Sequence, residues 1–341
     1  MSVGSGSDRR LAPERTTHVR AVTAEAYGGP EVLRLAEHDS PEPGPGQLLV
    51  DVTTAGVNYM DIYQREGRPP YAAGVPCVLG SEGAGTVAAA GPGVQGVRQG
   101  DRVAWTGIPG CYAEQVVVPA DRAVPVPDGI DLETAGAVML QGMTAHYLVT
   151  DTYPVAEGDP VVVHAAAGGV GLLLTQMVKM RGGTVIATTS TLQKAELARA
   201  AGADHVASYD DFGVVTREVT GGDGAAVVYD GVGQATFDAS LGALRRRGYM
   251  VLYGAASGPV PPLDPQRLNT GGSLFLTRPT LAHYIAAREE LLSRAEDLFG
   301  WITQGKLDVR IGGRYPLAEA ARAHEDLAAR RTTGKLILLL R

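Results

Sequence analysis

Cysteine is scarce in this chain of 341 residues, which contains only Cys77 and Cys111. Two cysteines leave room for one disulfide, but they cannot build a disulfide framework or supply the three or four thiolates of most structural zinc sites. The seven histidines are scattered, and no two of them have the four-residue spacing of a helical metal site. Low cysteine content suits a reducing compartment, so we expect a cytoplasmic protein.

Long apolar runs and an excess of positive charge are also missing. No stretch reaches 18 uninterrupted apolar residues, so no membrane span is expected. Residues 1–17 are polar and lack the apolar core of a secretion signal, and we expect them to form a disordered extension. The chain has 30 basic and 37 acidic residues, a net charge of −7, which disfavours general binding to nucleic acid or anionic membranes.

What the chain does contain is enough apolar sequence, 45% of its residues, for a sizeable core. From residue 18 to about 127, short apolar runs alternate with Gly/Pro turns, which predicts β structure with one helical patch at 58–66. From 161 to 254, strands and helices alternate, which predicts a parallel sheet with right-handed crossovers. The expected strands are 161–164, 184–188, 205–207, 225–229 and 248–253, and the expected helices are 171–180, 192–201, 211–220 and 234–244.

The end of the chain predicts how these two parts are connected. A long helix is expected at 283–303, followed by an apolar strand at 335–340. If that strand returns to the first part, the fold is α/β: a doubly wound parallel sheet inserted into a β-rich domain. We expect the β-rich domain to comprise residues 18–142 and 279–341, and the inserted domain residues 143–278. The cleft between the domains is then the default ligand site.

A glycine-rich turn follows the first buried strand of the inserted domain. Gly168, Gly169, Val170 and Gly171 stand between this strand and an apolar helix. Backbone N–H groups at a helix start, together with the helix dipole, bind a pyrophosphate, and small residues let the backbone approach it. The match to the G-x-G-x-x-G pattern is partial, because Ala166 occupies its first position. The strand and helix on either side favour a dinucleotide site over a plain tight turn.

Residues 187–194 indicate which dinucleotide binds. An NAD site places an acid about 20 residues past the loop, but this stretch has none and offers Ser190 and Lys194 instead. These residues suit a 2′-phosphate, so we expect NADPH; the alternative is that Lys194 is an ordinary surface lysine. Tyr209, just past the third strand, either flanks the adenosine phosphate or is a strand-end aromatic. Gly254 either admits the nicotinamide ribose or belongs to a plain turn.

Several ordered motifs identify a resemblance that covers nearly all of residues 18–340. The sequence resembles the zinc-free quinone oxidoreductase, or zeta-crystallin-like, branch of the medium-chain dehydrogenase/reductase superfamily, and most of all the bacterial NADPH:quinone reductases. The motifs are YGGPEVL (27–33), AGVNYMDIY (55–63), GSEG (80–83), GDRV (100–103), HAAAGGVG (164–171), YDGVG (229–233), GSLFLTRP (272–279) and RRTTGK (330–335).

The resemblance implies a GroES-like catalytic domain, a Rossmann NADPH-binding domain and a homodimer joined through edge strands of the Rossmann sheet. It also implies a set of NADPH contacts. These are Asn58, Tyr63, Thr144, Gly168, Gly169, Val170, Ser190, Lys194, Tyr209, Tyr253, Gly254, Thr277 and Arg330. Of these, Arg330 and Thr277 depend on the resemblance alone, and the alternative for both is surface or interdomain packing.

The residues at the zinc-ligand positions of related enzymes argue against a metal. Asn58 stands where those enzymes have a cysteine, and Ser81 where they have a histidine. Without a Lewis acid, hydride transfer favours an acceptor that delocalises the incoming charge, such as a quinone or an enone. We expect Asn58 and Tyr63 to act at the reaction centre, the alternatives being a helix cap and core packing. Asp61 is expected to orient or cap the local chain.

The resulting hypothesis is an NADPH-dependent reductase of quinones or related conjugated carbonyls that works without a metal. One alternative is an enoyl or alkenal reductase that saturates a C=C bond. Another is an NADPH-binding protein with a structural or RNA-binding role. Arg68, in a proline-rich loop expected beside the acceptor, either attracts an anionic acceptor or is solvated. The basic run 245–247 is interpreted as a solvated helix end.

Overall fold

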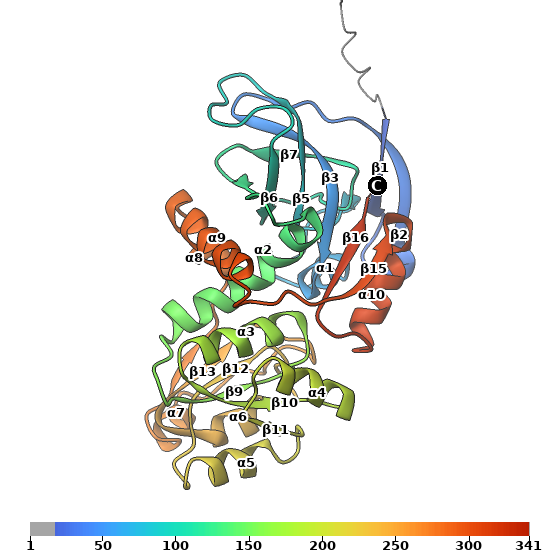
Figure 1. The fold of residues 1–341 in the computed structure, drawn as a ribbon. Helices are drawn as coiled ribbons and strands as arrows, with labels where there is room; N and C mark the ends of the chain where they lie inside the picture. The colour runs from blue at the N-terminus through green and yellow to red at the C-terminus, as the bar shows by residue number, and fades with distance from the viewer. Residues whose placement is uncertain (1–17, 341) are drawn as a thin grey trace, which may run out of the picture.

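The computed structural model describes residues 18–340, so the extension expected at residues 1–17 lies outside the described residues. The molecule has two lobes, which Figure 1 shows one above the other. The beginning and end of the chain form the upper, β-rich lobe, and the middle of the chain forms the lower, α/β lobe. This arrangement confirms the expected fold class.

The lower lobe is built on a six-stranded sheet in which every neighbouring pair is parallel. Its order, β11-β10-β9-β12-β13-β14, is that of doubly wound dinucleotide-binding sheets. The chain adds β10 and β11 on one side of β9 and then β12, β13 and β14 on the other, so the switch point lies between β9 and β12. The strands are β9 (Pro160–Val163), β10 (Thr184–Thr188), β11 (His205–Ala207), β12 (Ala225–Asp230), β13 (Leu244–Leu252) and β14 (Phe275–Thr277).

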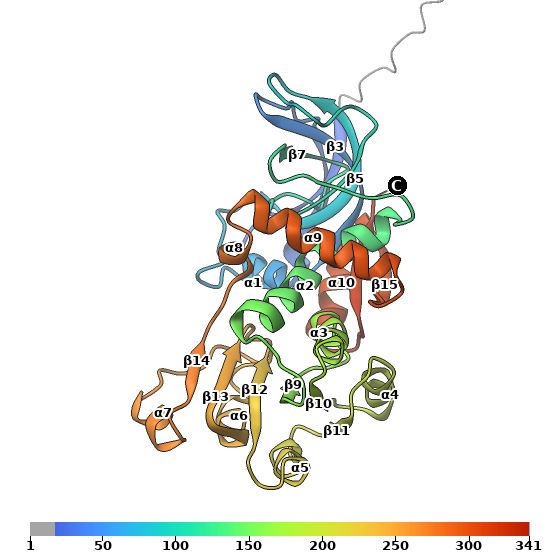
Figure 2. The same cartoon turned by 60° about the vertical axis from the view of Figure 1, so that its left-hand side comes forward.

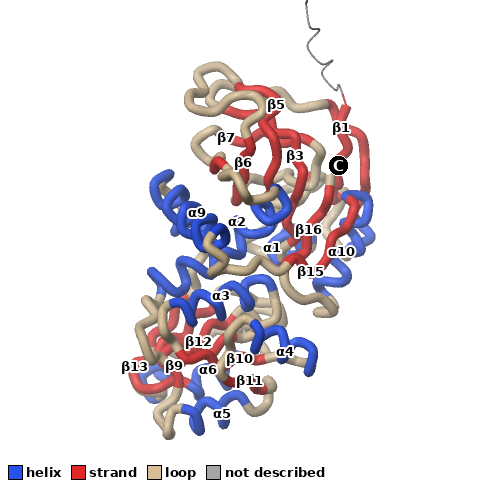
Figure 3. Tube along the Cα trace, viewed as in Figure 1, coloured by secondary structure: helices blue, strands red, loops and turns tan. Residues whose placement is uncertain are grey.

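Helices cover both faces of this sheet, as Figure 3 shows. Val161 and Val163 of β9 pack in one core cluster with residues of α3 and α4, whereas Val162 packs in another with residues of α5 and α6. Burial on both sides explains why β9 is an unbroken apolar run instead of an alternating one. The helices are α3 (Gly169–Met180), α4 (Leu192–Ala200), α5 (Phe212–Val219), α6 (Phe237–Ala243) and α7 (Gln266–Thr270).

The upper lobe contains a seven-stranded sheet in the order β15-β16-β3-β5-β6-β8, with β7 also paired to β3, and a small sheet β2-β1-β4. The last strand, β16, pairs with β3, so the lower lobe is inserted between two parts of the upper one. The strands are β1 (His18–Ala24), β2 (Leu33–Asp39), β3 (Gln47–Val57), β4 (Cys77–Val78), β5 (Glu82–Ala90), β6 (Arg102–Thr106), β7 (Gln115–Pro119), β8 (Val124–Pro125), β15 (Ile311–Pro316) and β16 (Lys335–Leu339).

The remaining helices belong to the upper lobe or join it to the lower one. Among these, α2 packs on β3 and β5 of the upper lobe and on α3 of the lower lobe. Figure 2 shows α2 and α9 running across the molecule where the lobes meet. The helices are α1 (Tyr59–Arg65), α2 (Leu132–Tyr147), α8 (Leu281–Tyr284), α9 (Arg288–Thr303) and α10 (Ala320–Ala328), with short turns η1 (Pro30–Val32), η2 (Leu148–Thr152) and η3 (Leu317–Glu319).

Three expectations about secondary structure were wrong or incomplete. The single helix expected at 283–303 is two helices, α8 and α9, separated by residues 285–287. The run 245–247 is not a helix end, because β13 begins at Leu244 and Arg245 pairs with Asp159; Arg246 and Arg247 are exposed. Helix α2 was missed because it is buried almost all round, which removes the amphipathic pattern that marks a surface helix.

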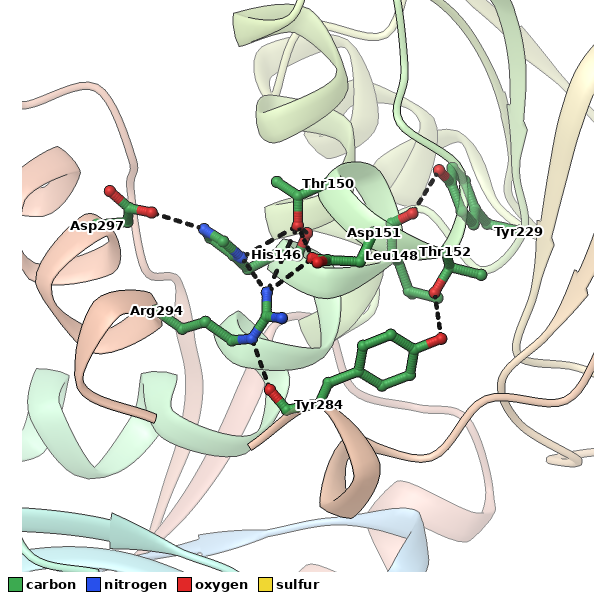
Figure 4. Close-up of polar contacts among 9 residues, drawn as sticks. All are labelled: His146, Leu148, Thr150, Asp151, Thr152, Tyr229, Tyr284, Arg294 and Asp297. Atoms are coloured by element: carbon green, nitrogen blue, oxygen red, sulfur yellow. Dashed lines mark hydrogen bonds and ion pairs between the residues drawn. The ribbon is translucent and has the colours of Figure 1, made fainter. Parts of the chain in front are cut away.

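A buried polar network joins α2 to α9 (Figure 4). One guanidinium nitrogen of Arg294 donates to His146 Nδ1 at 2.9 Å and to Asp151 at 3.0 Å, and Nε of Arg294 donates to the Tyr284 carbonyl at 2.8 Å. His146 Nε2 donates to Asp297 at 2.9 Å. Burial lowers the pKa of His146, so the ring is neutral and its Nδ1 accepts. The network fixes the segment between α8 and α9 against α2.

Replacing Arg294 by Met removes these contacts and leaves His146 Nδ1 and the Tyr284 carbonyl without their donor. We expect the free energy of unfolding to fall by about 2–4 kcal/mol, because buried acceptors then lose their partner. Arg322→Met is the control, since this arginine is 67% exposed in its surface ion pairs and should change stability by less than about 1 kcal/mol. Equal effects of the two variants, measured by denaturant unfolding, would contradict the role assigned to the network.

Candidate active site

The loop between β9 and α3 is shaped to hold a phosphate group. Ala165 has a left-handed backbone (φ 50°), and the Gly168 N–H donates to its carbonyl at 2.8 Å. A Cβ on Gly171 would lie 2.3 Å from the Ala165 oxygen, and one on Gly169 would lie 1.8 Å from Oε1 of Gln141. Because the clash at position 171 is with backbone, only glycine fits there, whereas a side chain at position 169 would need Gln141 to move. The first N–H groups of α3 have no partners inside the helix.

A cavity of about 200 Å³ lies beside this loop. Ser190, Lys194 and Arg330 are among the residues that line it, and Lys194 Nζ donates to the Arg330 carbonyl at 2.7 Å. Burial, and then the nearby Arg330 charge, lower the pKa of Lys194. No aspartate or glutamate of the described chain lines this cavity. The cavity therefore combines a helix start with two cations, as a dinucleotide carrying an extra phosphate requires.

A second cavity, of about 330 Å³, continues from the first. The two share Tyr59, Gln141, Val170, Gly231 and Tyr253 in their linings. A dinucleotide lying along the glycine loop would place its reactive end where the cavities join. The rest of the second cavity is then free for an acceptor.

Asn58 lies at this junction, at the start of α1, and its amide is held from both ends. Its Nδ2 donates to Glu82 Oε1 at 2.7 Å, and its Oδ1 accepts from Lys335 Nζ at 2.8 Å and from Gln141 Nε2 at 3.2 Å. Lys335 can only donate, so the orientation of the amide is determined. The oxygen has used both lone pairs, whereas the nitrogen keeps one N–H. Asn58 can therefore offer a ligand one donor and no acceptor.

A buried ion pair between Lys335 and Glu82 supports this amide. Lys335 is 2% exposed and Glu82 is fully buried, and the second oxygen of Glu82 accepts from the Leu140 N–H at 2.6 Å. An ammonium group beside Asn58 and Glu82 repels a metal cation. With Ser81 at the remaining ligand position, the residues at this place do not fit a zinc ion. Residues 18–340 hold no group of three His, Cys, Asp or Glu side chains arranged for a metal.

Two other polar side chains complete the geometry. Asp61 accepts from the Asn58 N–H at 2.8 Å and from the Tyr112 hydroxyl at 2.9 Å, so it caps α1 as expected. Burial raises the pKa of Asp61 to about 6. The Tyr63 oxygen accepts from the Ala255 N–H at 3.3 Å, which leaves its O–H free to donate into the second cavity. Burial raises the pKa of Tyr63, so the hydroxyl stays protonated.

The structure gathers all but one of the predicted site residues around the two cavities. The exception is Thr277, which lies in β14 outside both linings, whereas its neighbour Arg278 lines the second cavity. The first cavity is lined by Gly168, Gly169, Val170, Ser190, Lys194, Tyr209, Tyr253 and Arg330, and the second by Asn58, Tyr63, Thr144, Val170, Tyr253 and Gly254.

Four residues of this region were not singled out from the sequence. Lys335 belongs to the RRTTGK motif, which was a signal for it, but its partner Glu82 lies 253 positions earlier. Gln141 sits on the unexpected helix α2. Arg122 and Arg278 line the second cavity; Arg278 belongs to the GSLFLTRP motif, which was a signal for it, whereas Arg122 lies in no such motif.

The fold and the joined cavities define a two-lobed, Rossmann-type oxidoreductase with a GroES-like lobe. Family models agree: residues 44–128 match the alcohol dehydrogenase GroES-like domain, and residues 201–338 match a domain described as zinc-binding dehydrogenase. In the described part of the chain, no helix has the length and apolarity to cross a membrane.

Individual relatives show to which branch of these oxidoreductases the chain is most similar. A quinone oxidoreductase of Pseudomonas aeruginosa is 47% identical over 92% of this chain and 97% of its own length. A 2-haloacrylate reductase of a Burkholderia species is 41% identical over 94% and 99%. A mycobacterial protein solved in complex with NADPH is 49% identical, with a TM-score of 0.91 over 94% of this chain and 99% of that one. The chain belongs to the quinone oxidoreductase branch of the medium-chain dehydrogenase/reductase superfamily.

The buried ion pair generates a stability prediction. Lys335→Met leaves the Glu82 carboxylate buried without a counter-ion, and we expect the free energy of unfolding to fall by about 3–5 kcal/mol. The double variant Lys335→Met/Glu82→Gln removes both charges and should recover part of this loss. Additive losses in the double variant would refute the pairing. The control is Arg314→Met, which breaks the half-exposed pair with Glu133 at a cost below about 1 kcal/mol.

Proposed function

We propose that this protein is an NADPH-dependent oxidoreductase that reduces quinones or related conjugated carbonyls without a metal. The observation that carries the proposal is the continuity of the two cavities. One end has the glycine loop with Lys194 and Arg330, and the other has the hydrogen-bond donors of Asn58 and Tyr63. The quinone oxidoreductase and NADPH-bound relatives support the same reading.

The residues of the first cavity fit NADPH. The N–H groups at the start of α3 would hold the pyrophosphate, and Lys194, Ser190 and Arg330 would hold the 2′-phosphate. When bound, NADPH supplies a hydride and leaves as NADP⁺, and one further proton from water completes the conversion of a quinone to a hydroquinone. The remaining predicted contacts with NADPH, including Thr277, stay predictions.

Asn58 and Tyr63 act on the acceptor oxygen. As an electron pair enters the acceptor, negative charge develops on its carbonyl oxygen. The free N–H of Asn58 and the free O–H of Tyr63 are donors that stabilise this charge in place of a metal. Lys335 and Glu82 hold the Asn58 amide in its donating orientation before the acceptor arrives, so no reorganisation is needed during the reaction. A quinone needs no stronger stabilisation of its carbonyl oxygen than these two donors provide, because it delocalises the incoming charge.

A C=C reductase activity is the second candidate. The Burkholderia relative is named as a reductase of 2-haloacrylate, whose alkene is conjugated with a carboxylate. The same donors would then stabilise the enolate oxygen.

NADPH oxidation measured against a quinone, an alkenal, an enoyl thioester and a simple ketone separates the candidates. Turnover of the quinone supports the first proposal, and turnover of the alkenal or thioester alone supports the second. Binding of NADPH without any turnover would reject both.

The cofactor preference depends on Lys194. We expect Lys194→Ala to raise the KM for NADPH by about tenfold or more, because a charge-assisted hydrogen bond to phosphate is lost, and to leave the KM for NADH unchanged. The exposed Lys306, which lines neither cavity, provides the matched control Lys306→Ala. An equal rise in the KM for both cofactors would show that Lys194 does not bind the 2′-phosphate.

We also propose a homodimer joined through β14. This strand is one of the two edges of the lower sheet in the described chain, as Figure 2 shows, and Phe275 and Leu276 on it are 49% and 37% exposed. An exposed apolar edge is a ready partner for another strand. We expect Leu276→Glu to yield monomers in sedimentation experiments, whereas Val214→Glu, at an equally apolar exposed position on α5, should not. A dimer that survives Leu276→Glu would place the interface elsewhere.

A cytoplasmic location stays a proposal, supported by the low cysteine content.

A further inference from the structure

Two arginines, Arg122 and Arg278, line the second cavity. Arg122 lies in the turn after β7, and Arg278 directly follows β14, so they come from parts of the chain 156 positions apart. Neither lines the first cavity, nor do they belong to the residues shared by the two linings. They therefore belong to the acceptor part of the site and not to the part beside the glycine loop.

Their charges are not balanced within the described chain. One nitrogen of Arg122 donates to the Ile285 carbonyl at 2.8 Å. Arg278 donates to the Pro279 carbonyl at 3.2 Å and to the Tyr71 hydroxyl at 3.5 Å. These partners are all neutral, and no aspartate or glutamate of residues 18–340 lines the second cavity or forms an ion pair with either arginine. A guanidinium has five N–H donors, so most remain available.

Other arginines near the site behave differently. Arg68, suggested by the sequence as a possible contact for an anionic acceptor, pairs with Glu66 at 2.5 Å, is half exposed and lines neither cavity. Arg294 pairs with Asp151. Arg68 and Arg294 thus have carboxylate partners, whereas Arg122 and Arg278, like Lys194 and Arg330 at the first cavity, hydrogen-bond only to neutral groups. The second cavity, lined mainly by tyrosines and aliphatic side chains, thus has two arginines without carboxylate partners in its lining, Arg122 half-buried and Arg278 exposed to solvent, and both can bind a negatively charged group.

We propose that the acceptor is a conjugated carbonyl compound that carries an anionic group, a carboxylate or a sulfonate, which Arg122 and Arg278 bind. This inference rests on the proposed function and names its substrate class. Asn58 and Tyr63 contact the reacting carbonyl end, and the arginines contact the charged end. The reaction is unchanged: one hydride and one proton are added to the acceptor, while NADPH becomes NADP⁺.

A matched pair of acceptors tests the proposal on the whole enzyme. The ratio of kcat/KM for 1,2-naphthoquinone-4-sulfonate to kcat/KM for 1,2-naphthoquinone is measured in wild type, Arg122→Met, Arg278→Met and the double variant. Comparing ratios across variants cancels the difference in intrinsic electrophilicity. We expect the ratio to fall by about tenfold or more in at least Arg278→Met, and further in the double variant. Arg98→Met, which removes a 90% exposed arginine, should leave the ratio and the activity unchanged.

A binding measurement gives a readout independent of turnover. Naphthalene-2-sulfonate and naphthalene-2-sulfonamide have nearly the same shape, but only the first is an anion. We expect wild type to bind the sulfonate about tenfold or more tightly than the sulfonamide in calorimetric titrations, and the double variant to lose this preference. The preference should also weaken with rising ionic strength.

The outcomes separate failure of this inference from failure of the proposed function. If wild type reduces the neutral quinone but the ratio and the binding preference are the same in all variants, the anion site is rejected and the quinone reductase stands. If Arg278→Met raises the KM for NADPH and leaves the ratio unchanged, this arginine serves the cofactor and the inference is overturned. If wild type reduces neither quinone, the proposed function itself fails. 2-Chloroacrylate as a third acceptor shows whether the charged substrate is an enoate or a quinone.

Discussion

The ion pair between Lys335 and Glu82 is the interaction on which the rest of the site depends. It joins the last strand of the chain, β16, to the start of β5, and through Glu82 to the backbone of α2 at Leu140. Three separate segments thereby meet at one buried point beside Asn58. Burying two charges is costly unless every polar atom is paired, and here both oxygens of Glu82 and the ammonium of Lys335 have partners. The pairing makes the position of each segment depend on the other two.

This cluster also bears on the proposal that the reaction proceeds without a metal. Zinc in such folds would polarise an oxygen as a fixed positive charge. Here the positive charge belongs to Lys335, which is turned toward Glu82 and the oxygen of Asn58 and does not itself line either cavity. In the proposed reaction, its effect would reach the acceptor only through the oriented amide N–H of Asn58. That is a weaker electrophile than a metal, and it matches acceptors that need little activation.

The sequence predicted what depends on local order. It predicted the lower lobe from the alternation of strands and helices and from the glycine loop, because each of these signals lies within about 30 residues of chain. Helix α2 has no polar face, so periodicity could not reveal it. The basic run 245–247 has the composition of a helix end, yet Arg245 finds its partner on a neighbouring loop, in Asp159. The orientation of Asn58 depends on Lys335, 277 positions later, and no local pattern reports such a contact.

The return of β16 to β3 has a consequence for the order in which the protein is made. Domains fold as the ribosome releases them, from the N-terminus onward. The parallel sheet of the lower lobe is complete once β14 has emerged, but β3 lacks its neighbour β16 until Lys335 and the residues after it have been synthesised. The parallel sheet and its glycine loop can therefore form early, while the first cavity is completed last, because Arg330, Gly334 and Leu336 in its lining are among the last residues synthesised. A prematurely terminated chain would retain the glycine loop and lack the group that orients Asn58.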